Sequence, residues 1–172
     1  KIKQWKVPPT VKTELLRFLD DLALGKVNRG KRISPMRQLK YLYALKAPLE
    51  YFNKPTLELT LRDIENLERA LGSGRLANHF SGKPLAHSTQ VALRILLKIF
   101  LRWRLGTAKA DDLTGWLDTH PRAKTPDFLK EAEVEQLFHN CRNAQQQFLI
   151  AVLFDSGARA EEFHNIRFED IF

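Results

Sequence analysis

Apolar residues recur at intervals of three and four along most of the chain, which is the spacing of one face of an α-helix. Leu15, Leu16, Leu19 and Leu22 share such a face within a helix that we expect over about residues 10–24. Gly25 follows, and glycine is the common residue just past a helix end. Because nothing in the sequence is typical of a strand before Ile171 and Phe172, where we expect a strand to begin, the sequence predicts a mainly α-helical protein.

Two further helices have recognisable starts. Ser34 can cap the free N–H groups of a second helix, and Pro35 suits its first turn. We expect Pro48 to kink or end this helix, since proline removes a backbone donor and clashes with the preceding turn. Thr60 suits the cap of a third helix over about 61–71.

The most apolar helix is predicted over about residues 88–105, with Ser88 as its cap and Gly106 as its end. Three cations interrupt its surface at intervals of four and therefore form one narrow stripe. These cations are Arg94, Lys98 and Arg102. A helix this apolar is buried on most sides, so the stripe faces either water or phosphate.

A proline-containing stretch without apolar periodicity, residues 119–126, is predicted to be a linker. It divides the chain into a helical domain, residues 1–118, and a second part, residues 127–172. In the second part we expect a helix that starts near residue 130, another over about 144–155 and a short one over about 159–166.

The charge is distributed unevenly along the chain. The net charge is +8, but residues 1–126 contain 24 Lys and Arg against 11 Asp and Glu, a net charge of +13. Residues 127–172 contain 4 Lys and Arg against 9 Asp and Glu, a net charge of −5. A basic domain of this kind indicates a polyanionic partner, most simply double-stranded DNA. The alternative is a basic surface that is merely solvated.

The candidate DNA-contacting residues come from three segments. The predicted loop at 26–35 is basic, the second helix has cations off its apolar side, and the helix over 88–105 has its stripe. Taken alone, the stripe is better explained by solvation of an exposed edge. Together, the three segments favour a phosphate-facing surface. The candidates are Arg29, Lys31, Arg32, Arg37, Lys40, Arg94, Lys98 and Arg102.

Several classes of protein are disfavoured by the sequence. No apolar run approaches the ~20 residues of a membrane span, and no signal-peptide pattern is present. Cys141 is the single cysteine, so we expect no disulfides and a cytoplasmic location. The histidines show no metal-ligand spacing and the glycines form no nucleotide-binding motif, so we expect no metal and no cofactor.

The last nineteen residues, FDSGARAEEFHNIRFEDIF, contain a candidate anion site. Gly157 allows a sharp turn, which puts Arg159 at the head of the following helix, near its free N–H groups. Glu162 lies three residues on, on the same helical face, and can hold the arginine in position. An ordinary surface ion pair explains the same spacing, and spacing alone favours that simpler explanation.

This segment resembles the region around the first catalytic arginine of tyrosine recombinases, the family of phage integrases and Xer-type chromosome resolvases. The matching positions are Gly157, Arg159, Glu162, Ile166, Asp170 and Ile171. Phe163 and His164 depart from the aliphatic residues common there. LKEAEVEQLF is similar to the opening of the family's catalytic domain, and STQVALRILLKIFLRW resembles the last long helix of its core-binding domain.

The resemblance implies a four-to-five-helix SAM-like core-binding bundle, a linker, and the opening helices of a truncated mixed α/β catalytic domain. It implies site-specific DNA recombination through a 3′-phosphotyrosyl intermediate, without a metal, by a tetramer assembled on DNA in the nucleoid. Arg159 corresponds to the first catalytic arginine and Glu162 to the acidic residue that supports it.

We expect the remaining active-site residues, including the nucleophile, to lie beyond Phe172, so that this chain binds DNA without cutting it. Tyr41, Tyr43 and Tyr51 fall in the second helix and are not candidates for the nucleophile. One alternative is a non-catalytic helical DNA-binding regulator or a truncated recombinase relative. Another is a protein-interaction bundle whose basic face is incidental.

Overall fold

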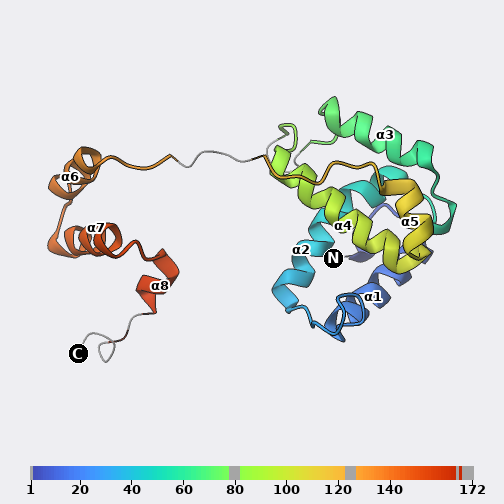
Figure 1. Cartoon of the computed structure of the whole chain (residues 1–172), viewed down its shortest axis with the longest axis horizontal. Coiled ribbons are helices and arrows are strands. Elements are labelled where there is room, and N and C mark those ends of the chain that lie inside the picture. The colour runs from blue at the N-terminus through green and yellow to red at the C-terminus, as the bar shows by residue number, and fades with distance from the viewer. Residues whose placement is uncertain (1, 78–81, 123–126, 166, 168–172) are drawn as a thin grey trace. The chain divides into compact units, whose positions relative to one another are not determined.

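The computed structural model describes residues 2–77, 82–122, 127–165 and 167, and it divides into two compact units (Figure 1). Unit 1 is Lys1–Ala123 and unit 2 is Lys124–Phe172. The division falls inside the stretch 119–126 that the sequence marks as a linker. Within the described residues the regular elements are helices, and the predicted mainly α-helical character is confirmed.

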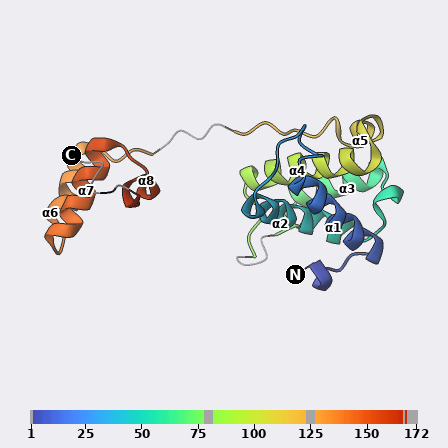
Figure 2. The ribbon, with the colours of Figure 1, turned by 90° about the horizontal axis from the view of Figure 1, so that it is seen from below.

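Unit 1 is built around its longest helix, α4 (Figures 1 and 2). Its α-helices are α1 (Pro9–Ala23), α2 (Pro35–Phe52), α3 (Leu61–Gly72), α4 (His87–Leu105) and α5 (Thr107–Thr114). Two short 3-10 turns, Ile2–Gln4 and Thr56–Glu58, accompany them. Helix α4 packs against α1, α2 and α5, which explains why its sequence is apolar on most sides.

The core of unit 1 contains an aromatic cluster where α1 meets α4. The ring of Phe18 lies 5.2 Å from that of Phe100, edge to face, and 5.2 Å from that of Trp103. The indole N–H of Trp103 donates to the carboxylate of Asp21 at 3.0 Å, so its polar atom is satisfied at the edge of the core. Of the predicted apolar face of α1, Leu15 and Leu22 are fully buried, whereas Leu16 is 55% exposed and lies off the face that packs into the core.

Most predicted helix boundaries are confirmed within a residue or two. Ser34 caps α2, since its hydroxyl accepts from the N–H of Arg37, and Gly106 ends α4. Thr60 precedes α3, where its N–H and its hydroxyl both donate to the carboxylate of Asp63.

Of the two expected effects of Pro48, a kink or an end of the helix, the end is wrong, because α2 continues to Phe52. Pro48, Leu49 and Phe52 are all buried. A proline inside a helix costs about 3 kcal/mol, and burial of Leu49 and Phe52 stabilises by an amount of at least that order.

Two other expectations about unit 1 need correction. Ser88 does not cap α4, because the helix begins at His87 with Ala86 as its cap residue. The amide of Gln90 donates to the carbonyl of Leu85 and fixes this earlier start. Helix α5 was not predicted, since its eight residues contain too few apolar positions to show a helical period.

Unit 2 contains the three helices that the sequence predicts there. They are α6 (Glu131–His139), α7 (Ala144–Ser156) and α8 (Ala160–His164). The side chain of Asn143 caps α7 by accepting from the N–H of Gln146 at 2.9 Å, and Gly157 ends it. Neither α6 nor α7 has a buried residue, and Phe148 and Phe154 are exposed. The strand expected to begin at Ile171 and Phe172 lies outside the described residues.

Candidate nucleic-acid interface

The segment between α1 and α2 is a tightly hydrogen-bonded loop. The N–H of Gly30 donates to the carbonyl of Gly25 at 2.9 Å, and the N–H of Ile33 donates to that of Leu22 at 3.2 Å. Ile33 is buried in the core. Gly25 has φ +81°, and a Cβ there would lie 2.7 Å from the Gly30 oxygen, so only glycine fits. The loop is therefore held at both ends and closed on itself.

Four of the predicted DNA-contacting side chains surround one hollow on this loop, of about 720 Å³. They are Arg29, Lys31, Arg32 and Arg37. All four are exposed, and the described residues provide no carboxylate partner for any of them. Arg29 adopts φ +49°, a left-handed conformation that is uncommon for residues other than glycine. Such a concentration of unneutralised cations attracts an anion strongly.

The first turn of α2 adds to this positive potential. The helix begins at Pro35, directly beside Arg32 and Arg37, and the N-terminal end of a helix dipole carries partial positive charge. Lys40, one turn further along α2, is also exposed and has no carboxylate partner among the described residues. Five of the eight candidates are thus gathered at one end of α2. We call these five, Arg29, Lys31, Arg32, Arg37 and Lys40, the loop cluster.

The three cations of α4 have a different environment, because each contacts another part of unit 1. The guanidinium of Arg94 donates to both carboxylate oxygens of Glu68 on α3, at 2.9 and 2.7 Å. These hydrogen bonds raise the pKa of Arg94 above its ordinary value, although partial burial opposes them. The Arg94 side chain is only 12% exposed, so it offers little surface to a phosphate.

Lys98 and Arg102 tie α4 to the residues that follow it. The ammonium of Lys98 donates to the carbonyls of Gly115 at 3.3 Å and Leu117 at 3.1 Å. The guanidinium of Arg102 donates to the carboxylate of Asp111 on α5 at 2.8 Å. The stripe therefore joins α4 to α3, to α5 and to the segment after α5. This geometry favours a structural role for these residues over phosphate contact.

A shallow groove of about 430 Å³ runs between α2 and α4 beside the loop cluster. Small residues of both helices, Ala44, Ala47 and Ala92, let the two backbones approach closely. Lys40, Tyr43, Ser88 and Thr89 supply polar groups along it. The helical spacing of the sequence predicts that Tyr43 shares the apolar side of α2 with Leu39, Leu42 and Leu45, whereas its side chain is 58% exposed. The alanine spacing in α2 was the available signal for this groove.

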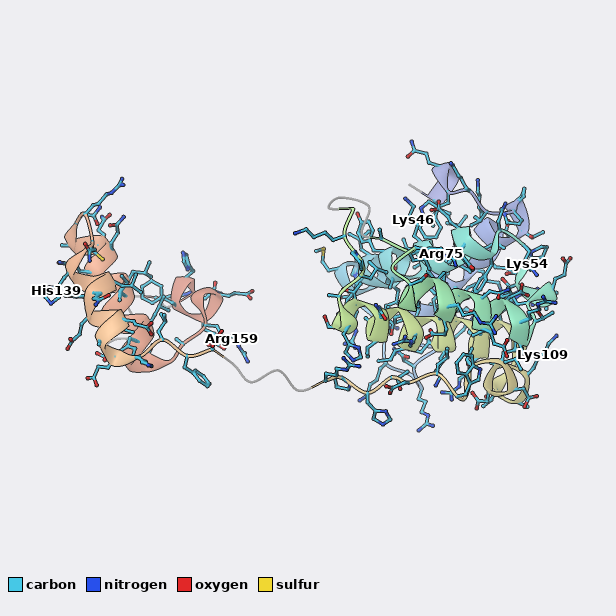
Figure 3. All side chains as sticks on the ribbon, turned by 90° about the horizontal axis from the view of Figure 1, so that it is seen from above. Lys46, Lys54, Arg75, Lys109, His139 and Arg159 are labelled. Carbon is cyan, nitrogen blue, oxygen red and sulfur yellow. The ribbon has the colours of Figure 1, made fainter. Side chains whose placement is uncertain are left out.

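Arg159 and Glu162 are paired in unit 2, at the start of α8. The backbone N–H of Arg159 donates to one carboxylate oxygen of Glu162 at 2.8 Å, and its guanidinium donates to the other at 3.3 Å. The Arg159 side chain is 86% exposed, and Figure 3 labels it at this helix start. The geometry fits both an arginine positioned for an anion and an ordinary surface pair, which contributes little to stability.

The remaining sequence candidates lie as follows. Tyr41 is buried in the core, and the hydroxyl of Tyr51 donates to the backbone carbonyl of Asn66 at 3.1 Å.

Within the described residues, no three His, Cys, Asp or Glu side chains gather as a metal site would require. Likewise, no helix in the described part of the chain is long and apolar enough to span a bilayer. Ile166, Asp170 and Ile171, three positions of the recombinase pattern, lie outside the described residues.

Comparison of the chain with known protein families, with curated proteins and with solved structures found no match.

Proposed function

We propose that unit 1 binds double-stranded DNA through the loop cluster and that the chain is part of a tyrosine-type site-specific recombinase. The observation that carries the DNA-binding part is the separation of the cations into two groups. The α4 stripe is neutralised or bonded within unit 1, whereas the loop cluster is exposed and has no carboxylate partner among the described residues.

Contacts with the phosphate backbone suit this arrangement. Lys and Arg side chains that neutralise phosphates release condensed counterions, which provides much of the affinity of a protein for DNA. The loop cluster sits at the start of α2, so bound phosphates would meet both the side-chain charges and the positive end of the helix dipole. Beside it, Ser88 and Thr89 offer hydroxyl groups that can donate to and accept from base edges or phosphates.

The recombinase part of the proposal rests on the resemblance around Arg159, and the pairing with Glu162 supports it. In that reaction a tyrosine oxygen attacks the DNA phosphorus, the bond from phosphorus to the 5′ oxygen breaks, and a 3′-phosphotyrosyl linkage forms. Negative charge increases on the non-bridging oxygens in the transition state, and a guanidinium can donate to two of them at once. Arg159 would supply that guanidinium, and Glu162 would hold its backbone and side chain in place.

On this proposal unit 1 corresponds to the SAM-like core-binding bundle and unit 2 to the opening of the mixed α/β catalytic domain. The complete protein would assemble as a tetramer on its DNA and act in the nucleoid. It would contribute the tyrosine and the remaining active-site groups from residues other than those described.

A second candidate, a DNA-binding protein without cleavage activity, is favoured by the exposure of Arg159. An arginine side chain that is 86% exposed and paired with a nearby glutamate is also consistent with an ordinary surface ion pair at the start of a helix. Both candidates share the DNA-binding role of unit 1 and differ only in covalent chemistry.

Trapping of a covalent intermediate separates the two. The complete protein is incubated with a duplex that is nicked just 3′ of the cleavage position, so that the small cleaved fragment diffuses away and religation fails. A recombinase gives a protein–DNA adduct that survives denaturing detergent and is removed by protease. Binding to the same duplex without any adduct would reject the recombinase and leave the second candidate; absence of binding would reject both.

A further inference from the structure

The segment that follows α5 does not leave unit 1 where the helix ends. It turns and runs back along α4, toward the start of that helix (Figures 1 and 2). The turn is closed by the N–H of Leu117, which donates to the carbonyl of Thr114 at 3.1 Å. The side chains of Thr114 and Leu117 are buried in unit 1. The segment is thus anchored in the core at its beginning.

Side chains of α4 then hold the segment in reverse order along the helix. Lys98 donates to the carbonyls of Gly115 and Leu117, at 3.3 and 3.1 Å. Nearer the start of α4, Nε2 of His87 lies 3.4 Å from the carbonyl oxygen of His120. Lys98 and His87 are eleven residues apart, which corresponds to about 16 Å along a helix. The segment therefore follows α4 over about three turns.

Between these two points the charges of α4 and the segment are complementary. The pKa of Asp118 lies below its ordinary value because the backbone N–H and the ring of His120 donate to it and, to a smaller extent, because Arg94 is near. Asp118 in turn contributes to the raised pKa of Arg94, after the larger effect of Glu68. Arg94 thus attracts the middle of the segment, although its hydrogen bonds go to α3.

We propose that residues 115–120 form a strap, which moves the point where the chain leaves unit 1 from the end of α5 to the start of α4. The inference does not depend on DNA binding, since it rests on contacts within unit 1 alone. Its consequence concerns the tether to unit 2, because residues 115–120 then belong to unit 1 and not to that tether.

Release of the strap would lengthen that tether. Six additional extended residues add at most about 20 Å of reach. The effective concentration of a tethered domain at its target falls as a flexible linker grows beyond the required span. A fixed strap therefore restricts where unit 2 can act relative to whatever unit 1 holds.

Lys98 is the side chain to change, because it makes two of the direct bonds to the strap. Lys98→Met retains the length and packing of the stem but removes the donors. Lys109 on α5 provides a matched control, since it is exposed and has no partner among the described residues; Lys109→Met changes the charge by the same amount. Thermal unfolding followed by circular dichroism establishes that each variant is folded.

The measurement is the distance distribution between two spin labels, one on α3 and one just past the strap. Cys141→Ser removes the natural thiol, and Arg62→Cys and Arg122→Cys introduce the labelling sites, both at exposed positions. We expect a single narrow distribution in the parent protein and after Lys109→Met. After Lys98→Met we expect a distribution at least about twice as wide, because the strap residues become part of a flexible linker.

Two results would overturn the proposal. A broad distribution in the parent protein would show that residues 115–120 are not held on α4, whatever the variants do. A folded Lys98→Met protein with the narrow distribution of the parent would show that Lys98 does not hold the strap. If Lys98→Met fails to fold, the distance distribution of the parent still tests the proposal. Limited proteolysis with chymotrypsin provides a second measurement, because cleavage of the folded parent after Trp116 or Leu117 would contradict the strap.

Discussion

The guanidinium of Arg94 on α4 donates two parallel hydrogen bonds to the carboxylate of Glu68 on α3, with N–O distances of 2.9 and 2.7 Å. Both side chains are largely buried, with 12% and 18% of their surfaces exposed. Two bonds between planar groups fix both the spacing and the orientation of the partners. A residue that the sequence suggested for phosphate contact therefore joins two helices of unit 1.

Arg94→Met is expected to lower the free energy of unfolding of unit 1 by about 2–3 kcal/mol, because the Glu68 carboxylate is left partly buried without its partner. Urea denaturation measures this change. The double change Arg94→Met with Glu68→Met should recover part of the loss, since no unpaired charge remains. Under conditions where the single variant is folded, its affinity for DNA should equal that of the parent. A variant of parental stability that loses DNA binding would contradict the structural role of Arg94.

The loop cluster depends on the backbone at Gly25, which offers a second test. Gly25→Ala combines a left-handed backbone with a Cβ placed 2.7 Å from the Gly30 oxygen, so we expect a loss of about 2–3 kcal/mol in unfolding free energy. Gly30→Ala is the matched control, because Gly30 has a similar φ of +86° but no atom within 4 Å of the added Cβ. It should cost only about 1 kcal/mol. Equal costs in urea denaturation would show that the close approach at Gly25 is unimportant.

Asp63 makes the stability of unit 1 dependent on acid pH. Burial raises its pKa, but the ammonium of Lys54 and the N–H and hydroxyl of Thr60 donate to the carboxylate, and together they leave the pKa below its ordinary value. A carboxyl with a lowered pKa in the folded state contributes stability above its unfolded-state pKa and loses it as the pH falls through the folded-state pKa. The parent should therefore lose stability below about pH 4.

Asp63→Asn removes this titration, so its stability should fall less steeply than that of the parent over the same pH range. Urea midpoints measured from neutral pH down to about pH 2.5, below the ordinary carboxyl range, provide the comparison. Parallel curves for the two proteins would show that Asp63 does not contribute to the acid sensitivity.

Arg159 is predicted to act on the reaction and not on DNA binding. In the complete protein, Arg159→Ala should reduce covalent adduct formation by at least about 100-fold, because a positioned donor to the transition-state oxygens is removed. Glu162→Gln should have a smaller effect, since the amide oxygen can still accept from the backbone N–H of Arg159. Adduct yield and duplex affinity are measured on the same variants. Loss of affinity in proportion to loss of adduct would indicate a structural arginine.

The helices of the fold could largely be predicted from the sequence, because their signals are local. Ser34 before Pro35 and the apolar spacing of Leu15 and Leu22 depend only on neighbouring residues. The continuation of α2 through Pro48 could not be predicted, since it depends on how deeply Leu49 and Phe52 are buried by distant helices. Local preference was outweighed there by tertiary packing.

The candidate site was predictable to a smaller degree, because charge is visible in the sequence but its neutralisation is not. Arg94 and Arg37 look alike as exposed cations on basic helices. They differ in the structure because Glu68, twenty-six residues before Arg94, approaches only one of them. The strap was hidden for the same reason, since Lys98 bonds to backbone carbonyls, which every residue has.

The most direct test of the central claim is the salt dependence of duplex binding by residues 1–172, measured by fluorescence anisotropy. For the parent, the logarithm of affinity should fall steeply with the logarithm of salt concentration. Replacing Arg29, Lys31, Arg32 and Arg37 with serine should reduce that slope by about one unit for each phosphate that the variant no longer neutralises.

A control variant with the same change in net charge should keep most of the affinity and slope. It replaces four exposed cations outside the loop cluster, which are Arg62, Arg69, Arg75 and Lys109. Equal reductions in the two variants, or parental binding that is absent or insensitive to salt, would contradict the claim that the loop cluster binds DNA.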